Sequence, residues 1–193
     1  MMVSIDTTFR LVVTESGGNL VQQLELCDLK LRSVTDPNAL VTTFGQPALA
    51  TMVGSASIPT YTPTVGGPVT VPPITIQTGS NVPCTGSCGF SSFVDSDHDS
   101  NPGISISATI GGVLPLVAYS ALTIPTTVTS ATLTDENTID GSWGFSANGQ
   151  VWATSSVLYP GGPISVTPDL ATSPFTAKKL AGNVPCSTIN ALP

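Results

Sequence analysis

Charged side chains are scarce in this 193-residue sequence, where they make up 9% of the residues, against about 25% in ordinary soluble domains. Five residues are basic and twelve are acidic, so the formal net charge is -7. The basic residues are Arg10, Lys30, Arg32, Lys178 and Lys179. A face that binds nucleic acid needs clustered Lys or Arg to neutralise phosphates. The sequence therefore argues against a nucleic-acid partner.

Long hydrophobic runs are also absent. The longest apolar stretch, residues 110–124, is interrupted by Gly111, Gly112 and Pro115, and it is shorter than the roughly 18 residues that a transmembrane helix needs. The N-terminus has no basic segment followed by an apolar one. We therefore expect neither a membrane span nor an ordinary secretory signal.

Residues suited to catalysis are few. The one histidine, His98, lies among carboxylates that favour its charged form and so weaken it as a general base. No Gly-x-Ser-x-Gly motif presents a serine nucleophile. A glycosidase-type pair among Glu15, Glu25 and Glu136 remains open as an alternative, because spacing in the sequence does not test it. The prediction is that the protein is not an enzyme.

Short runs of β-branched and aromatic residues, separated by Gly, Pro, Asn or Asp, follow one another along the whole chain. They cover residues 7–14, 20–34, 39–44, 68–77, 103–110, 126–134, 149–156 and 163–167. No window of useful length keeps apolar residues at helical spacing without a Pro or Gly inside it. This pattern predicts an all-β fold with little helix, either an antiparallel β-sandwich or a jelly-roll-like barrel.

The second of these runs changes phase in its middle. Leu24 and Leu26 share one face of an extended strand, whereas Leu29 and Leu31 share the other. One extra residue produces such a change, because side chains alternate strictly between the two faces. The pattern predicts a β-bulge near residues 27–28, or a strand that passes between two sheets.

Prolines crowd residues 58–73. They are Pro59, Pro63, Pro68, Pro72 and Pro73. Proline has no N–H for a ladder and favours extended backbone, so we predict a rigid extended arm that lies along another surface, with an edge strand as the alternative. The motif Asn-Val-Pro-Cys occurs at both 81–84 and 183–186, which leaves open a two-lobed arrangement with a boundary near 95–102. The prediction is a single β domain over residues 1–193.

Two dipeptides predict hairpin turns. Gly17-Gly18, within Ser16–Asn19, predicts that the first two strands are antiparallel neighbours, and Asn148-Gly149 predicts a turn between two later strands. Trp143, Trp152 and Tyr159 fall around the second turn, where they could pack in the core, form a protein interface or stack on a sugar. This hairpin resembles the strand-turn-strand elements, apolar or aromatic around Asn-Gly, of small structural proteins of tailed phages.

Four cysteines allow three pairings. Cys84 and Cys88 are four residues apart in a Gly-containing stretch, close enough for a local disulfide in an oxidising medium. Cys27 and Cys186 are left to pair with each other, to stay free or to pair between subunits. A zinc site of Cys84, Cys88 and His98 is the less favoured alternative, because no second Cys pair follows.

Asp95, Asp97 and Asp99 place carboxylates at alternating positions, as at the start of a calcium loop. An EF-hand would need Gly at the sixth position and Glu at the twelfth, where this chain has Ser100 and Ile106. The stretch is therefore either a solvated surface loop or an irregular Ca²⁺ site. No other cofactor is expected.

Low charge, many hydroxyl side chains and 17 prolines are typical of an extracellular surface, yet we expect no export signal. A virion protein meets both conditions, because it assembles in the host cytoplasm and is exposed afterwards. We therefore expect a structural protein of a tailed-phage-type particle: a capsid decoration, cement or minor coat protein that contacts copies of itself and other virion proteins, such as a major capsid protein. The alternative is an extracellular ligand- or sugar-binding β module, such as an adhesin or tail-associated domain.

Overall fold

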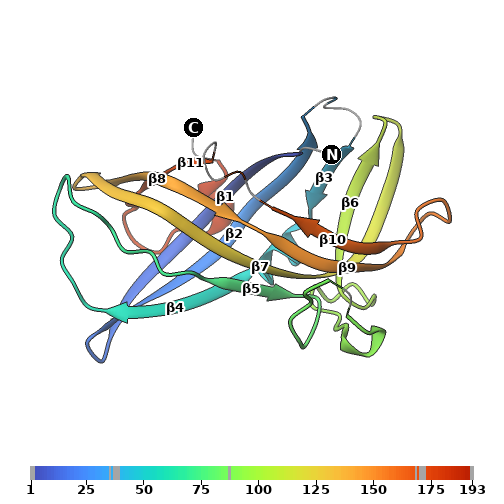
Figure 1. Ribbon diagram of the computed structural model, residues 1–193, viewed down its shortest axis with the longest axis horizontal. Coiled ribbons are helices and arrows are strands. Elements are labelled where there is room, and N and C mark those ends of the chain that lie inside the picture. The colour runs from blue at the N-terminus through green and yellow to red at the C-terminus, as the bar shows by residue number, and fades with distance from the viewer. Residues whose placement is uncertain are drawn as a thin grey trace.

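The computed structural model describes residues 3–34, 36, 40–86, 88–167, 169 and 173–191. Within this part, eleven strands join in one antiparallel network, which confirms the all-β prediction (Figure 1). The strands are β1 (Val3–Ser16), β2 (Asn19–Ser33), β3 (Leu40–Phe44), β4 (Val53–Pro59), β5 (Thr75–Thr78), β6 (Ile104–Ile110), β7 (Leu114–Asp135), β8 (Thr138–Phe145), β9 (Ala147–Thr154), β10 (Gly162–Val166) and β11 (Pro174–Lys178).

Helix content is low, as expected. The helical turns of the described residues are α1 (Gln46–Ala50), η1 (Phe90–Ser92) and α2 (Cys186–Ile189). None of the helices found there is long and apolar enough to cross a bilayer.

The β1–β2 hairpin follows the sequence prediction. Ser16 pairs with Asn19, and the turn residues Gly17 and Gly18 have φ values of 58° and 76°, which favour glycine. Thr8 pairs with Asp28 but the next residue of β1 pairs with Leu26, so the residue between them on β2 is an extra, bulged residue. The predicted β-bulge is therefore confirmed at position 27.

Strand β2 also changes partners at this bulge. Its first part, 19–25, pairs with β4, and residues 30–32 pair with β3. The bulge lets Leu24, Leu26 and Leu29 all point inward, because the extra residue moves the later leucine to the face of the earlier two. The change of phase in the sequence thus coincides with the point where β2 changes its pairing partner from β4 to β3.

Strand β7 is the centre of a second, longer hairpin. Its residues 126–135 pair with β8, and its residues 118–123 pair with β9, so β8 and β9 follow β7 in succession with only Ser146 between them. On its other edge β7 pairs with β6 and then with β5. This one strand therefore connects both halves of the sheet network.

The predicted turn at Asn148-Gly149 is wrong. Both residues lie inside β9, where Gly149 pairs with Leu122 of β7. A Cβ at Gly149 would lie 2.2 Å from the carbonyl oxygen of Ala121, so glycine is needed here for close packing rather than for a turn. The strands before and after Ser146, β8 and β9, each pair with β7, and the turn of the β7–β8 hairpin lies at Glu136 and its neighbour.

The Pro-rich stretch leaves the end of β4 and runs along the edge of β7. Gly66 donates its N–H to Leu133 O at 2.7 Å, Val69 donates to Ala131 O at 2.8 Å, and Pro68 forms a bridge with Thr132. The stretch therefore follows a strand of its own chain. The sequence left open a boundary between two lobes near residues 95–102. Strands from the two sides of this stretch pair with each other, as β3 does with β6.

The core lies between the β1–β2 hairpin and the strands that cross it in Figure 1, β7 and β8. Phe9 of β1 packs on Trp143 of β8 with ring centroids 5.0 Å apart, and Ile76 and Ile124 are almost fully buried beside them in the same cluster. Burying one such side chain stabilises the fold by about 1.5–3 kcal/mol relative to leaving it exposed. These contacts hold the two layers together.

We predict that Ile124→Ala lowers the free energy of unfolding by about 2–5 kcal/mol, because it leaves a cavity among packed neighbours. Urea unfolding of the disulfide-intact chain measures this change. Val157→Ala is the control, since Val157 is 96% exposed and its truncation should change stability by less than about 0.5 kcal/mol. Equal losses in the two variants would contradict this location of the core.

Candidate functional site

The loop of residues 79–103, between β5 and β6, carries most of the candidate site residues predicted from the sequence. Its two ends, Gly79 and Gly103, press against strand β7. A Cβ at Gly79 would lie 2.3 Å from Ser120 O, and a Cβ at Gly103 would lie 2.6 Å from it. Both glycines have positive φ, 73° and 101°. Glycine therefore fixes both ends of the 79–103 loop on β7.

A disulfide between Cys84 and Cys88 closes a small ring in this loop, with Cα atoms 5.3 Å apart. Cys84 is buried, and its N–H donates to the Thr123 hydroxyl oxygen at 2.8 Å, which ties the ring to β7. Because both sulfur atoms are oxidised, neither can bind metal as a thiolate. The alternative zinc site with His98 is therefore wrong in this structure.

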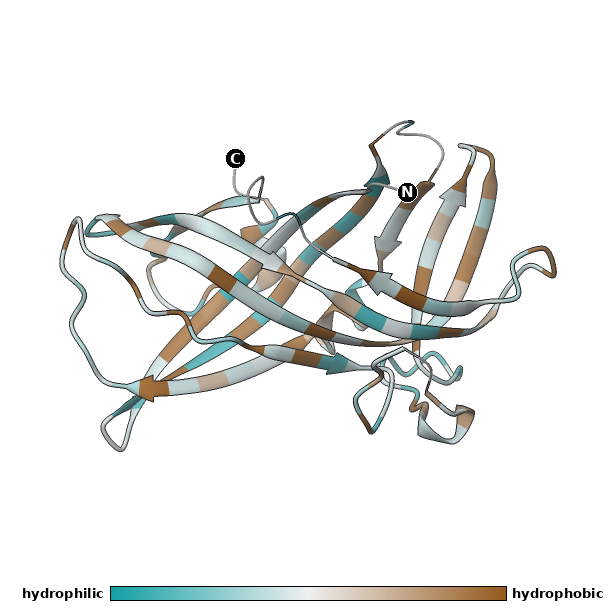
Figure 2. Cartoon of the chain, viewed as in Figure 1, coloured by the Kyte–Doolittle hydropathy of each residue, from teal (hydrophilic) through white to brown (hydrophobic). Residues whose placement is uncertain are grey.

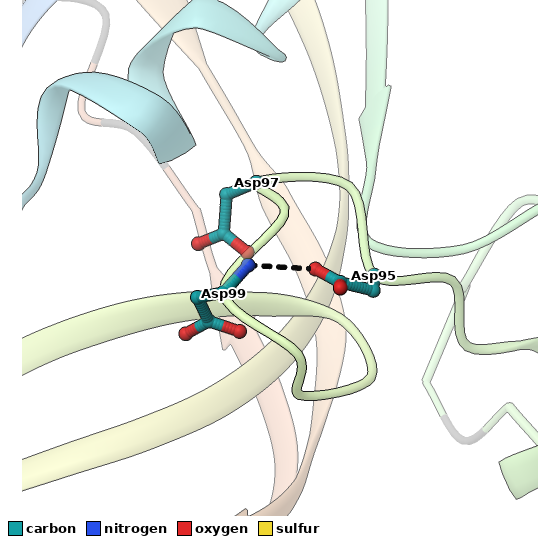
Figure 3. Close-up of side chains that lie close together, drawn as sticks. All are labelled: Asp95, Asp97 and Asp99. Atoms are coloured by element: carbon teal, nitrogen blue, oxygen red, sulfur yellow. Dashed lines mark hydrogen bonds between the residues drawn. The ribbon is translucent and has the colours of Figure 1, made fainter.

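Asp95, Asp97 and Asp99 do come together, with one carboxylate oxygen of each within 4.8 Å of the others. Asp95 reaches across the loop, where one oxygen accepts the N–H of Asp99 at 3.1 Å and the other accepts the N–H of Ser100 at 3.0 Å (Figure 3). Asp97 accepts the N–H of Ser105 at 2.8 Å, and the Ser105 hydroxyl donates to Asp99. The loop thus gathers three carboxylates at the start of β6.

The three carboxylates have different surroundings. The hydrogen bond from Ser105 lowers the pKa of Asp99 below its ordinary value; desolvation raises it, and the N–H of Asn101 lowers it further. Asp99 is therefore ionised at neutral pH. Asp97 is only 9% exposed, and its Oδ1 has no hydrogen-bond partner among the described residues. His98 is exposed beside them, with a left-handed φ of 58°.

An aromatic cluster of two loop residues and one residue of β7 surrounds Trp152 of β9. Its ring centroid lies 5.2 Å from that of Phe90, 5.8 Å from that of Tyr119 and 6.4 Å from that of Phe93. The indole N–H donates to the carbonyl oxygen of Pro102 at 2.6 Å, so the loop is fastened over the ring. Phe90 is 63% exposed. The Trp152 cluster is therefore an aromatic surface that is partly open to solvent.

The three aromatics that are close in sequence do not form one site. Trp143 is in the core against Phe9, whereas Trp152 lies in the partly open cluster and Tyr159 is exposed on the β9–β10 loop. The pairing of β7 with β9 skips Trp152, which makes it a bulged residue. A bulge re-aims a side chain. No pattern in the sequence indicated a bulge at Trp152.

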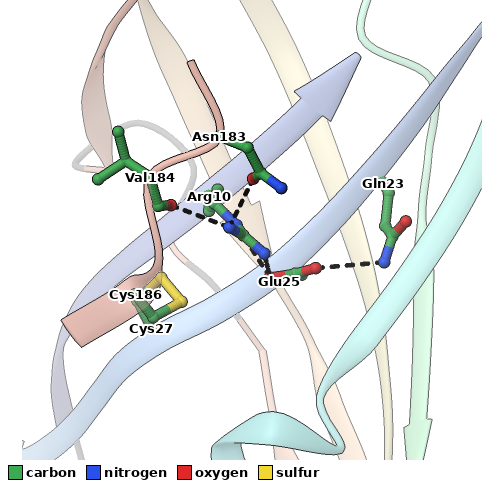
Figure 4. A network of polar contacts seen from close by, with 7 residues as sticks. All are labelled: Arg10, Gln23, Glu25, Cys27, Asn183, Val184 and Cys186. Atoms are coloured by element: carbon green, nitrogen blue, oxygen red, sulfur yellow. Dashed lines mark hydrogen bonds and ion pairs between the residues drawn. A yellow bond between two sulfur atoms is a disulfide. The ribbon is translucent and has the colours of Figure 1, made fainter. Parts of the chain in front are cut away.

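Arg10 connects the β1–β2 hairpin to the C-terminal segment (Figure 4). It forms an ion pair with Glu25, and its guanidinium also donates to the Asn183 side chain and to Val184 O, both at 2.9 Å. The pair is about four-fifths buried, so it is screened less than a surface pair. The Arg10 guanidinium thus connects Glu25 of β2 to residues 183–184 of the C-terminal segment.

The second disulfide, Cys27–Cys186, lies beside this network and has Cα atoms 4.9 Å apart. Asn190 donates its side-chain N–H to Cys27 O at 2.8 Å. The bulged residue of β2 is therefore the attachment point of α2, and the cysteines adopt one of the three pairings left open by the sequence.

The glutamates considered as a glycosidase pair occupy different places. Glu25 is paired with Arg10, and Glu15 lies five residue pairs further along the same ladder, about 17 Å away at 3.4 Å per residue. Glycosidase carboxylates lie about 5–9.5 Å apart. Glu136 lies in the β7–β8 turn. Glu15 and Glu25 therefore do not have the geometry of such a pair.

Several exposed apolar side chains belong to three loops that lie in the right-hand half of Figure 1; Figure 2 shows brown segments there, most plainly at the tip of the β9–β10 loop. We call these side chains the apolar tips. They are Val82, Phe90 and Val94 in the 79–103 loop, Val113 in the β6–β7 turn, and Val157, Leu158 and Tyr159 in the β9–β10 loop. The most exposed are Val157 at 96% and Val113 at 85%. Val13, Val34, Val65 and Leu180 are exposed in other parts of the chain.

No protein-family model, curated protein or solved structure matches this chain. Its function therefore has to be argued from the geometry of the described residues.

We predict that Gly79→Ala destabilises the protein more than Gly182→Ala. Both glycines have nearly the same φ, 73° and 79°, but a Cβ at Gly182 meets no atom within 4 Å. The φ alone should cost about 1–2 kcal/mol in each variant. Displacing the backbone at Ser120 should add about 1–3 kcal/mol in Gly79→Ala. Thermal unfolding measures the difference, and equal losses would contradict the close approach of loop and strand.

Proposed function

We propose that this protein is a structural component of a virus particle, which acts through contacts with copies of itself and with neighbouring coat proteins. The observation that carries the proposal is the set of apolar tips. Leu158 is 74% exposed next to Val157 in the β9–β10 loop, and Val113 is 85% exposed on the β6–β7 turn. Single exposed apolar residues are ordinary, whereas a concentration of them on one half of a molecule is typical of an interaction surface.

The energetics of the surface support contact formation. Stable interfaces bury about 1,200–2,000 Å², and apolar area contributes roughly 25 cal/mol per Å² when it leaves water. Since only 9% of the residues in the chain are charged, its surface also carries few groups that are costly to desolvate. A low-charge β-scaffold with apolar loops therefore suits a protein that works by being held in an assembly.

The two disulfides support an exposed setting. Disulfides persist in oxidising surroundings and are rare in reduced cytosol. A particle that is assembled in the host cytoplasm and then released would meet an oxidising medium in its final location. The disulfides Cys27–Cys186 and Cys84–Cys88 fit that history.

We predict that the chain co-purifies with particles in a fixed ratio to the coat protein, and that Val157→Ser with Leu158→Ser lowers its copy number at least about tenfold, because burial of these side chains drives the contact. Quantitative mass spectrometry of purified particles measures the ratio. Val65→Ser is the matched control, since Val65 is 59% exposed but lies in the Pro-rich stretch. Absence of the chain from particles, or unchanged incorporation of the double variant, would contradict the proposal.

The second candidate is an extracellular ligand-binding β module, and the Trp152 cluster favours it. An exposed aromatic ring beside carboxylates offers a stacking face and hydrogen-bond acceptors to a sugar. The exposed ring is that of Phe90, which stands edge-on to Trp152 at an interplanar angle of 69°.

If the protein binds a glycan through this cluster, Phe90→Ala should weaken binding by about tenfold or more, the order of one stacking contact. Tyr159→Ala, on a different loop, should leave binding unchanged. A glycan array followed by titration of any hit measures both. An array without a hit would exclude the second candidate and leave the first untouched.

A further inference from the structure

Three carboxylates of like charge lie together in the 79–103 loop, where the only basic side chain of the sequence is the exposed His98. The ion pairs Arg10–Glu25 and Lys30–Asp28 engage basic side chains away from the loop. The sequence has no Lys or Arg between Ser33 and Ala177, so the strands from β5 to β9, which flank the loop in the chain, supply none. Ionised carboxylates this close repel one another unless a cation lies between them.

Asp97 adds an independent observation. It is nine-tenths buried, one oxygen accepts the N–H of Ser105, and the other oxygen has no partner among the described residues. Exposed acidic loops commonly need no ion, because water satisfies their oxygens. A buried carboxylate oxygen without a donor is costly, and bound cations are one of the few groups that satisfy it.

The loop backbone is shaped to bring these oxygens to one side. His98 and Ser100 both have left-handed φ, 58° and 72°, so the chain turns twice within the acidic stretch. Asp95 and Gly103 then close the stretch with a bridge. These turns bring one carboxylate oxygen of each aspartate within 4.8 Å of the others, and Figure 3 shows the Asp95 carboxylate accepting the backbone N–H of Asp99 across the turn.

The geometry points to Ca²⁺ as the ligand. Two oxygens on opposite sides of a Ca²⁺ lie about 4.6–5.2 Å apart, whereas those around Mg²⁺ lie about 4.0–4.2 Å apart. The three oxygens lie within 4.8 Å of one another, which the coordination shell of a Ca²⁺ accommodates, and the irregular loop suits its flexible geometry better than the near-ideal octahedron that Mg²⁺ demands. The donor set is oxygen alone, which does not favour zinc. We propose that Asp95, Asp97 and Asp99 form a Ca²⁺ site that fixes the 79–103 loop to the start of β6.

Calorimetric titration of the EGTA-treated full chain with CaCl₂ tests the proposal. We expect one ion per chain with a Kd of about 10⁻⁴–10⁻³ M, the range of extracellular modules. At roughly ten times that concentration the Tm should rise by about 3–6 °C. MgCl₂ at the same concentration should give a clearly smaller rise.

Asp99→Asn keeps the shape of an exposed side chain, so it should fold and bind Ca²⁺ at least about tenfold more weakly. Asp97→Asn should abolish the response to Ca²⁺ and raise the Tm of the calcium-free protein, because it removes a buried charge without a donor. Asp140→Asn, in β8, is the control and should bind as the wild type does.

An absence of both binding heat and Tm change at about 10 mM CaCl₂, far above the expected Kd, would overturn the proposal. Equal responses to Mg²⁺ and Ca²⁺, or unchanged Ca²⁺ binding by Asp99→Asn, would overturn it too. A fall in the calcium-free Tm of Asp97→Asn would show that its oxygens are satisfied within the protein, which also contradicts the site. None of these outcomes bears on particle incorporation or glycan binding, so the functional proposals are tested separately.

Discussion

Backbone pairing along β7 connects the parts of this molecule. The strand is 22 residues long, and its two edges pair with β5 and β6 on one side and with β8 and β9 on the other. The Pro-rich stretch adds a bridge at Thr132. Since the core is formed where these strands face the β1–β2 hairpin, the layers can pack only if β7 remains continuous. Its backbone is also the surface on which the candidate site is built.

The 79–103 loop depends on β7 through main-chain contacts rather than through packing. Gly79 and Gly103 approach Ser120 O, and Cys84 donates to Thr123, so both ends and the disulfide ring of the loop contact β7 within residues 120–123. On the next strand, Trp152 holds the loop from the other side through Pro102. Anchors on a rigid ladder place a loop more precisely than side-chain packing alone, which explains how a loop with so little core can order three carboxylates.

Features that depend on neighbouring residues could be predicted from the sequence, whereas features that depend on contacts between distant residues could not. The Gly17-Gly18 turn and the bulge at position 27 were predicted because φ preference and alternation are local. The turn predicted at Asn148-Gly149 was wrong, because Gly149 lies within a strand, where its close contact with Ala121 requires glycine. The first half of β7 was missed because its prolines suggested breaks; Pro125, however, lies between the β9 and β8 pairings, where no ladder N–H is needed. The sequence predicted that the three aspartates could act together, but it gave no sign of the burial of Asp97 or of the side chains that contact Trp152.

Charge links the proposed cation site to the proposed assembly. Phe90 and Val94, two of the apolar tips, belong to the same loop as the three carboxylates, so a neighbour seated on those tips would meet negative charge close by. At physiological ionic strength that charge extends about 8 Å into solvent, and a second copy, itself of net charge -7, would be repelled. A bound divalent cation cancels two of the three local charges. The proposed cation would therefore reduce the repulsion that a neighbour meets at these tips, although the assembly proposal and the Ca²⁺ proposal are carried by different residues and are tested separately.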